Sequence, residues 1–291
     1  MRIAIIGSTG QLGTDLVRVL QEAGGYEVIP LSHAEIECTK PDSIRTALTG
    51  SCPQVVVNCA AFVRVDECED KPEEAFLVNA LGALHVARSC VDLDALCVYI
   101  STDYVFNGKK EEPYTEEDKP CPINVYGTSK LAGEYLVSQA CPKWLIVRMA
   151  SLFGKAGARG KGGNFVDAIL SKARAGESLR VVNDIRMSPT YSYDAAQVLE
   201  RLIRQGATGI FHVTNSGSCT WYEFARKALD LVSIEARMEP IFLSEYPTRA
   251  CRPKNSSLRS VELSENHLRS WEEALRAYLV EKAYTLSRAR D

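Results

Sequence analysis

The sequence lacks the features that would place it in several specialised classes of protein. Its ten cysteines include no CxxC pair and its four histidines show no ligand spacing, which argues against structural zinc. No apolar run approaches the roughly 20 residues of a membrane-spanning helix. No charged leader with an apolar core precedes the first apolar run, so no secretory signal is expected. We therefore expect a cytoplasmic protein with free thiols, no bound metal and no membrane contact.

An excess of charge of one sign is also missing. The chain has 34 Lys and Arg residues against 37 Asp and Glu residues, a net charge of −3, and it contains no strongly basic stretch. Nucleic-acid binding therefore has no electrostatic basis here. The 291 residues, 46% of them hydrophobic, are enough to bury a core without disulfides. This length predicts one large domain, or one domain with a smaller lobe.

The first half of the chain alternates short apolar runs with segments of helical spacing. Leu12, Leu16, Val19 and Leu20, for example, recur on one face of a helix. Strands separated by helices are typical of a parallel sheet that is covered on both faces. We therefore predict a Rossmann-type doubly wound α/β domain over residues 1–150. Its expected strands are Arg2–Ile6, Glu27–Leu31, Val55–Val57, Leu96–Ile100 and Trp144–Arg148, and its expected helices are Gln11–Ala23, Ala75–Cys90 and Tyr126–Val137.

The second half, residues 151–291, has a different pattern of short apolar runs and glycines. It predicts a smaller C-terminal substrate-binding lobe, with some elements returning to the sheet. It begins with the glycine-rich segment Gly154–Gly163, which is either a lid that closes over a site or a plain loop. The expected strands of this half are Leu179–Val182, Ile210–Val213 and Pro240–Phe242, and its expected helices are Ser192–Arg204, Trp221–Leu231 and a terminal one over Trp271–Arg288.

A glycine motif follows the first expected strand and opens the first expected helix. In Gly7-Ser-Thr-Gly10-Gln-Leu-Gly13, the first glycine allows a tight turn, the second lets backbone approach a pyrophosphate, and the third allows close helix–strand packing. Backbone N–H groups at a helix N-terminus favour an anion. The motif therefore predicts a dinucleotide-binding loop. Its expected cofactor contacts are Gly7, Thr9, Gly10, Gln11 and Leu12.

The end of the second expected strand bears on which dinucleotide binds. Sites that prefer NAD place an acid there, on the ribose 2′-hydroxyl. Here Ser32 and His33 occupy that position, and Glu35 and Glu37 lie further along the chain than the acid of such sites. A 2′-phosphate is not repelled by Ser32 and His33, so we expect NADPH as the cofactor, with NADH accepted as well.

Tyr126 and Lys130 stand four residues apart, and therefore share one face of a helix. Reduction of a ketone needs a proton donor beside the carbonyl oxygen. A neighbouring ammonium favours the phenolate, so we expect Lys130 to lower the pKa of Tyr126. Thr102 ends the fourth expected strand, where α/β folds bind their ligands, and its hydroxyl can orient the carbonyl.

Three segments around these residues, Ser101–Gly108, Pro113–Asp118 and Pro122–Glu134, resemble the dTDP-4-dehydrorhamnose reductase family of the extended short-chain dehydrogenase/reductase superfamily. The resemblance extends from Met1 to at least Leu258. It implies reduction of the 4-keto group of a nucleotide sugar, and a homodimer. The residues that it implies are Thr102, Tyr126 and Lys130 for catalysis; Asn58, Cys59, Ala60, Ala61 and Asn79 for the cofactor; and Asp103, Tyr104, Val105, Phe106 and Arg252 for the substrate.

The chain departs from the family pattern after the fifth expected strand. Family members commonly carry a tryptophan that packs against the sugar, and Ser151 occupies its place here, so Phe153 or another residue supplies any aromatic surface. Two alternatives therefore stay open. One is a reductase of another nucleotide sugar. The other is a non-catalytic NADP-binding subunit that resembles the regulatory beta subunit of methionine adenosyltransferase.

The glycine motif generates a first prediction. A valine side chain at position 10 would occupy the space that the pyrophosphate needs, so Gly10→Val should weaken dinucleotide binding. Titration of the cofactor by fluorescence measures the effect. Unchanged affinity would show that the motif does not bind the pyrophosphate.

Overall fold

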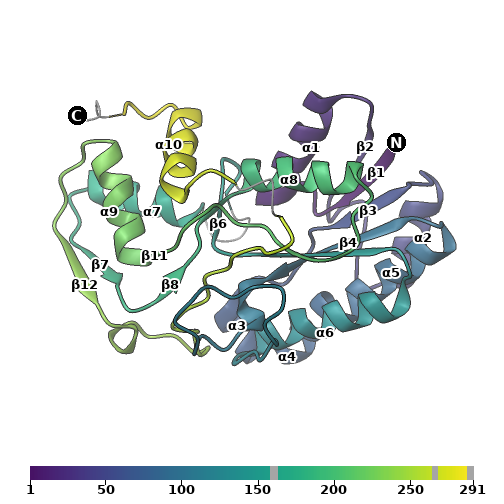
Figure 1. Ribbon diagram of the computed structural model, residues 1–291, viewed down its shortest axis with the longest axis horizontal. Helices are drawn as coiled ribbons and strands as arrows, with labels where there is room; N and C mark the ends of the chain where they lie inside the picture. Colours follow the sequence, from purple (N-terminus) through teal and green to yellow (C-terminus); the bar gives the residue numbers. More distant parts are fainter. Residues whose placement is uncertain (158–162, 264–267, 287–291) are drawn as a thin grey trace.

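A computed structural model describes residues 1–157, 163–263 and 268–286. Its centre is a six-stranded, all-parallel sheet with helices on both faces, as predicted (Figure 1). The strands lie in the order β10-β5-β4-β3-β1-β2. Their bounds are β1 Arg2–Ile6, β2 Glu27–Leu31, β3 Val55–Asn58, β4 Leu96–Thr102, β5 Trp144–Met149 and β10 Gly209–His212.

This strand order sets the position of the functional edge. β1 lies between β2 and β3, so the chain leaves β1 in one direction along the sheet and later continues from β3 in the other. Doubly wound sheets bind their ligands outside the carboxyl ends of the strands at such a switch point. The glycine motif after β1 and Asn58, the last residue of β3, both lie there.

Each face of the sheet is covered by its own helices. α1 (Gln11–Ala23) and α8 (Ser192–Arg204) pack side by side on one face, where their leucines and valines join the isoleucines of β1 and the leucine and valine of β5. α2 (Pro41–Thr49), α5 (Ala83–Asp92) and α6 (Val125–Ala140) cover the other. The bounds of α1 and α8 are those predicted, because the spacing of their apolar residues marks both ends.

The helix expected over Ala75–Cys90 has an interruption. It runs as α4 (Pro72–Phe76), a π-helical turn (Leu77–Gly82) and α5, after the short helix α3 (Val65–Asp70). Such π turns are rare and are frequent at functional sites. This one contains Asn79, whose side chain is fully buried. Apolar spacing alone does not reveal the turn, since the flanking helices keep the same buried face.

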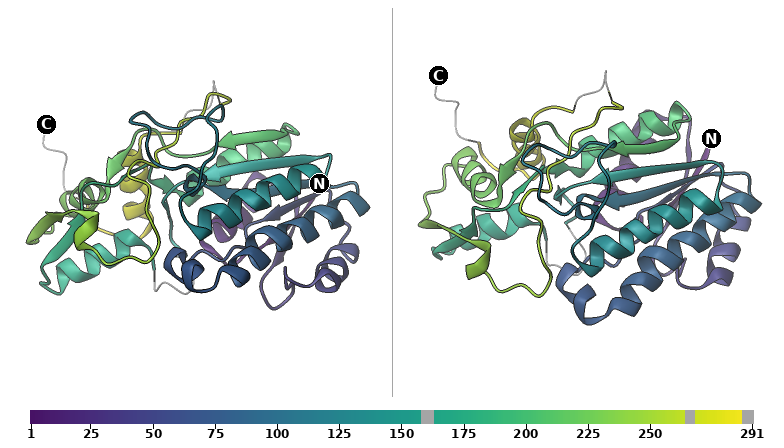
Figure 2. Two further views of the ribbon diagram at one scale, coloured as in Figure 1. Left: turned by 90° about the horizontal axis from the view of Figure 1, so that it is seen from below. Right: turned by 60° about the horizontal axis from the view of Figure 1, so that its bottom comes forward.

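A smaller lobe with its own apolar cluster stands beside the sheet (Figure 2). Part of the second half belongs to the sheet domain, namely α8 and the edge strand β10. The terminal helix ends at Glu281 rather than Arg288, and residues 287–291 lie outside the described chain. The lobe and its connections contain α7 Phe165–Arg174, α9 Trp221–Leu231, α10 Trp271–Glu281, β6 Leu152–Phe153, β7 Leu179–Val182, β8 Arg186–Met187, β9 Thr190–Tyr191, β11 Cys219–Thr220, β12 Met238–Ile241 and the 3₁₀ turn Leu243–Glu245. A further 3₁₀ turn, Asp103–Val105, directly follows β4.

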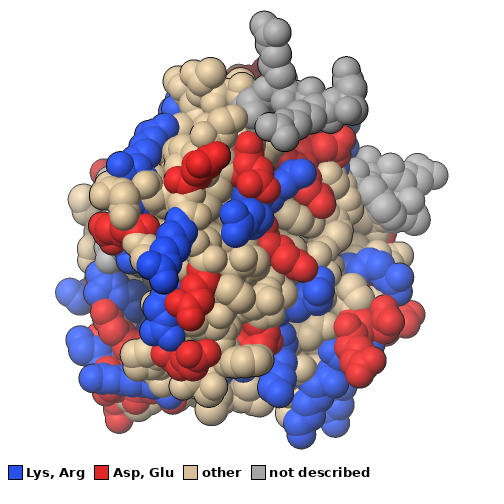
Figure 3. Space-filling model, turned by 90° about the vertical axis from the view of Figure 1, so that its left-hand side faces the viewer, with Lys and Arg blue, Asp and Glu red and all other residues tan. Residues whose placement is uncertain are grey.

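The surface of the lobe end carries positive and negative side chains interspersed (Figure 3). Such a mixture gives no field of one sign that would attract a polyanion to this face. Within the described ranges, no helix combines the length and the apolar character needed to cross a bilayer.

A buried ion pair joins helix α6 to the sheet. Glu134 of α6 accepts hydrogen bonds from Arg148 of β5 at Nε (2.9 Å) and Nη2 (2.7 Å), and from the Ser101 hydroxyl of β4 (2.5 Å). The side chains of Glu134 and Arg148 are only 3% and 2% exposed. Removing one partner of such a pair leaves a charge buried without compensation, which is strongly destabilising.

Arg148→Met should therefore lower the free energy of unfolding by about 3–5 kcal/mol. Urea unfolding followed by circular dichroism measures the change. Arg45→Met is the matched control, because the Arg45–Asp42 pair is exposed (69% and 86%) and such pairs contribute little. Equal midpoints for the two variants would contradict the anchoring role of the buried pair.

Candidate active site

The glycine loop has the geometry that the motif predicts. Gly7 adopts φ 77°, and its N–H donates to the Leu31 carbonyl at 2.8 Å, which seats the loop against the end of β2. A Cβ on Gly13 would lie 2.3 Å from the Gly7 carbonyl oxygen, so only glycine allows α1 to begin this close to the loop. Gly10 is the N-cap of α1, and no side chain caps that end.

These features fit a dinucleotide pyrophosphate. The first backbone N–H groups of α1 have no side-chain acceptor and face the switch point. The Gln11 Oε1 atom is buried without a hydrogen-bond partner among the described residues, and as an acceptor it suits a ligand hydroxyl rather than a phosphate oxygen. Leu12 is buried beneath the loop and Thr9 is half-buried, so Leu12 supports the loop through packing and offers a ligand only its backbone.

The structure revises the expectation for the end of β2. Glu35 does not lie too far along the chain, because its carboxylate folds back and accepts hydrogen bonds from the Ser32 amide (2.7 Å) and the Ser32 hydroxyl. His33 is exposed and stands 3.5 Å from Glu37. An acidic side chain therefore does lie at the end of β2. Its distance along the chain did not reveal this, because a turn brings Glu35 back to Ser32.

The segment after β3 lies directly against the glycine loop. Asn58 caps it by accepting the Ala60 amide at 3.1 Å, and a Cβ on Gly7 would meet the Ala60 nitrogen at 3.1 Å. Asn58 is buried, while Cys59, Ala60 and Ala61 are half-buried along this edge. Burial raises the pKa of the Cys59 thiol to about 12, so this group stays a neutral thiol at physiological pH.

Asn79 holds this segment in place. From the π turn, its Oδ1 accepts the Phe62 amide (2.8 Å), while its Nδ2 donates to the Phe62 carbonyl (3.2 Å) and to the Ser129 hydroxyl (3.0 Å). Both ends of the amide are thus used by the protein. We expect Asn79 to position the cofactor-side loop against α6 rather than to contact the cofactor itself.

Tyr126, Lys130 and Thr102 come together at the carboxyl edge of β4. Tyr126 lies in the first turn of α6, beside Thr102, the last residue of β4. Gly127 allows this approach, since a Cβ there would lie 2.0 Å from the Tyr104 carbonyl oxygen. The ring of Tyr104 meets that of Tyr126 edge-on at 5.9 Å.

The expectation that Lys130 lowers the pKa of Tyr126 is wrong for this structure. Burial dominates and raises the pKa of Tyr126 well above its usual value. Lys130 is itself 1% exposed; its Nζ donates to the Ile100 carbonyl at 2.6 Å and lies 4.0 Å from the Tyr99 ring centroid. Burial lowers the pKa of Lys130 to about 7, so its charge is only partly present at neutral pH.

The hydroxyl proton of Thr102 is used in a hydrogen bond to Asp103. The Thr102 hydroxyl donates to Asp103 Oδ1 at 2.9 Å and accepts from the Tyr104 amide at 3.2 Å. A hydroxyl has one proton, so towards Tyr126 it can act only as an acceptor while this bond lasts. Burial raises the pKa of Asp103 to about 6, and its Oδ2 is buried without a partner among the described residues.

The structure also revises several expected substrate contacts. Val105 and Phe106 are completely buried in a small apolar cluster, so they support the site by packing and present no surface to a ligand. Phe153 is 1% exposed inside the core of the lobe, where it stacks on Tyr191, so it cannot replace the family's tryptophan. Ser151 is half-buried and has φ 44°.

A cleft of about 750 Å³ lies between the loop after β4 and the smaller lobe. Arg252 reaches it, and its Nη2 donates to Asp66 at 2.8 Å while its Nη1 is buried without a partner among the described residues. The sequence did not single out the other cations of the cleft, because no pattern along the chain shows that the fold brings Lys109, Arg186 and Lys254 to one cleft. The cleft is lined by Asn107, Gly108, Lys109, Lys110, Glu111, Ile123, Asn183, Asp184, Arg186, Thr220, Arg252, Lys254 and Asn255.

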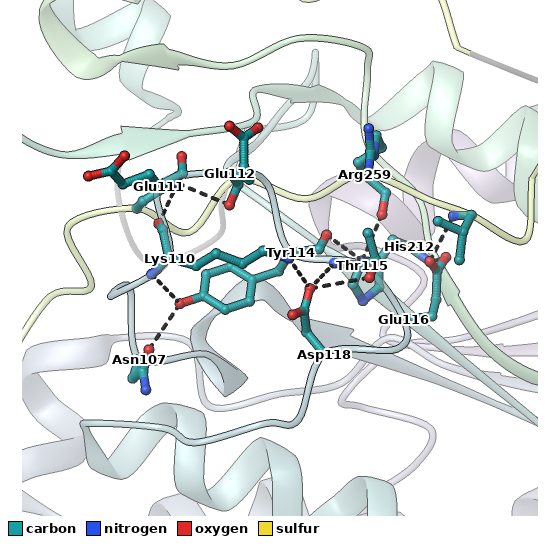
Figure 4. Close-up of polar contacts among 12 residues, drawn as sticks. Asn107, Lys110, Glu111, Glu112, Tyr114, Thr115, Glu116, Asp118, His212 and Arg259 are labelled. Carbon is teal, nitrogen blue, oxygen red and sulfur yellow. Dashed lines mark hydrogen bonds and ion pairs between the residues drawn. The ribbon is translucent and has the colours of Figure 1, made fainter.

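The loop that carries Lys109 and Lys110 is fixed by Tyr114 (Figure 4). The Tyr114 hydroxyl donates to Asn107 Oδ1 (2.9 Å) and accepts from the Lys110 amide (3.2 Å). Lys110 also pairs with Asp118 at 2.6 Å.

The described residues include no group of three or more His, Cys, Asp or Glu side chains that could hold a metal ion. The expected lid lies largely outside the described residues, which omit 158–162.

A glycine-lined anion loop and a tyrosine–lysine pair on one edge of a parallel sheet define the class of this protein. It is an oxidoreductase of the extended short-chain dehydrogenase/reductase type. A family model described as the RmlD substrate binding domain matches residues 1–284, and the chain belongs to this family.

Relatives and solved structures agree with this assignment. The chain is 39% identical over 284 residues to the spore coat polysaccharide biosynthesis protein SpsK of Bacillus subtilis, covering 97% of this chain and 98% of the relative. It is 36% identical to the dTDP-4-dehydrorhamnose reductase of Aggregatibacter actinomycetemcomitans, over 88% and 90% of the two chains. The structure of the dTDP-4-dehydrorhamnose reductase of Bacillus anthracis in complex with NADP has a TM-score of 0.92 at 35% identity, covering 96% and 99%.

The buried amine of Lys130 generates a prediction about stability. Its folded pKa of about 7 lies below the ordinary value of 10.5, so between these values the unfolded chain binds more protons and stability rises with pH. Lys130→Met should abolish this rise, and should raise the free energy of unfolding at pH 6 by about 5 kcal/mol, since one pKa unit corresponds to about 1.4 kcal/mol.

Urea unfolding between pH 6 and pH 10 measures both effects. Lys119→Met, at an exposed lysine, is the control and should keep the wild-type dependence on pH. If Lys130→Met is less stable than the wild type at pH 6, burial does not penalise this ammonium.

Proposed function

We propose that this protein reduces the 4-keto group of a nucleotide-linked deoxysugar, dTDP-4-dehydrorhamnose, to give dTDP-L-rhamnose. NADPH is the expected cofactor, with NADH also accepted. The observation that carries the proposal is the meeting of Tyr126 and Thr102 at the end of β4, between the glycine loop and a cationic cleft. The relatives named as dTDP-4-dehydrorhamnose reductases, and the NADP in one of their structures, support the choice of substrate and cofactor.

The bound dinucleotide supplies the hydride for the carbonyl carbon. Gly7, Gly10 and Gln11 would hold its pyrophosphate at the N-terminus of α1. Asn58 and Ala60 would line the opposite wall of the cofactor site. Because Lys130 lies one helical turn from Tyr126, its amine can hydrogen-bond the nicotinamide ribose once it turns from the Ile100 carbonyl.

Tyr126 then delivers the proton to the carbonyl oxygen. Burial keeps its phenol protonated at neutral pH, which is the form that a proton donor needs. Thr102 lies beside this phenol with its own proton directed to Asp103, so when substrate binds the phenol turns its single proton from Thr102 to the carbonyl oxygen. The phenolate left behind regains its proton from solvent.

The cleft suits the diphosphate of the substrate. Lys109, Lys110, Arg186, Arg252 and Lys254 outnumber the acids along its walls, and guanidinium groups match phosphate oxygens in geometry. The Nη1 atom of Arg252 has no hydrogen-bond partner among the described residues, so this donor could serve such a group. We propose that residues after 150, with the loop after β4, form the substrate side of the site.

All ten cysteines are free, which agrees with a cytoplasmic location.

One assay tests the proposal. The protein is incubated with NADPH and dTDP-4-dehydrorhamnose, and loss of absorbance at the nicotinamide band is followed. Turnover should occur, and Tyr126→Phe should lower it by about 10²–10⁴-fold because the proton donor is gone. Tyr135→Phe is the matched control: Tyr135 lies on the same helix but is 59% exposed, so turnover should not change.

Other results separate the alternatives. Tight NADPH binding with no turnover of any nucleotide sugar would favour the non-catalytic subunit. Turnover of a different nucleotide sugar would correct the substrate and keep the chemistry. Full activity in Tyr126→Phe would remove Tyr126 as the proton donor.

A further inference from the structure

The turn after β2 holds a carboxylate at the place where adenosine ribose groups bind. The Glu35 and Ile36 amides both donate to the Ser32 carbonyl at 3.1 Å, which closes the turn. Ile36 is 2% exposed and packs in the core below the sheet, so the turn is anchored from beneath. Glu35 itself is exposed, and its carboxylate reaches back to Ser32.

Ser32 offers two donors at this position, and Glu35 uses both. The backbone N–H and the hydroxyl of Ser32 donate to the same oxygen, Glu35 Oε2. The same hydrogen bonds lower the pKa of Glu35, so the group is a carboxylate at physiological pH. The Gly7 and Ser8 amides donate to the Leu31 carbonyl, so Ser32 directly adjoins the pyrophosphate loop.

We propose that Glu35 determines the preference of this protein between NADH and NADPH. This inference rests on the proposed function, because it requires a dinucleotide seated on the glycine loop. In this arrangement of the turn, the carboxylate can accept a hydrogen bond from a ribose 2′-hydroxyl. An acid at the end of the second strand makes the same contact in sites that bind NAD. A 2′-phosphate meets a like charge and competes for the same two donors of Ser32.

NADPH therefore binds only when Glu35 swings away. Its departure frees the amide and hydroxyl of Ser32, which are suitable donors for a phosphate, while exposed His33 is next to them. The turn thus has two arrangements, one for each cofactor. The motif Ser32-His-Ala-Glu35 replaces the single acid at the strand end with a serine and a movable acid.

The experiment measures the dissociation constants of NADPH and NADH separately, without substrate, by quenching of protein fluorescence at fixed ionic strength. Glu35→Gln removes the charge and keeps the size of the side chain. We expect NADPH to bind about tenfold more tightly, because the repulsion of the 2′-phosphate is gone, and NADH affinity to change less than about threefold.

Two further variants sharpen the result. Glu37→Gln removes the same charge two residues away, where the carboxylate contacts Thr39 and His33 instead of Ser32, and should leave the ratio of the two constants as in the wild type. Ser32→Ala removes one of the two donors, and should weaken NADPH more than NADH.

The outcomes separate this inference from the proposed function. If the wild type binds neither dinucleotide, both fall. If it binds them and Glu35→Gln leaves the ratio unchanged, or shifts it no more than Glu37→Gln does, only the role of Glu35 is overturned. A ratio that moves towards NADPH in Glu35→Gln alone supports the proposal.

Discussion

The buried pair of Glu134 and Arg148 is the contact on which the geometry of the site depends. It ties α6 to β4 and β5 at once, through Ser101 and Arg148. Tyr126 and Lys130 lie on α6, and Thr102 ends β4, so the pair fixes the frame in which these three side chains meet. A buried ion pair is stable only when its two groups keep good hydrogen-bond geometry. A shift of α6 by one residue along the sheet would break this pair.

The same contact extends to the substrate side. The guanidinium of Arg148 lies 5.3 Å from the ring centroid of Phe106, which stacks on Tyr114 at 4.3 Å. Tyr114 in turn fixes the loop that carries Lys110 into the cleft. Phe106 is thus buried away from the cleft, and its packing connects the sheet to the loop that lines the cleft.

The sequence was sufficient where local patterns decide the structure. The bounds of β1, α1, β2, α8 and α9 follow from apolar spacing and from glycine and capping signals, and the glycine loop follows from its place between a strand and a helix. It was insufficient where contacts between distant segments decide. Glu35 folds back on Ser32, Phe153 enters the core of the lobe, and Lys130 turns to the Ile100 carbonyl. No pattern along the chain records these contacts, since each depends on which segments the fold brings together.

Unsatisfied polar groups gather on the edge of the sheet where the two proposed ligands would meet. Gln11 Oε1, Asp103 Oδ2 and Arg252 Nη1 are each buried without a hydrogen-bond partner among the described residues. Each such group costs about 1–3 kcal/mol of stability. Folding alone gives no reason to keep them, because an apolar residue of similar size would be more stable. A ligand that supplies the missing hydrogen-bond partners explains why they are kept. Binding such a ligand then gains the hydrogen-bond free energy that is absent in the unliganded protein.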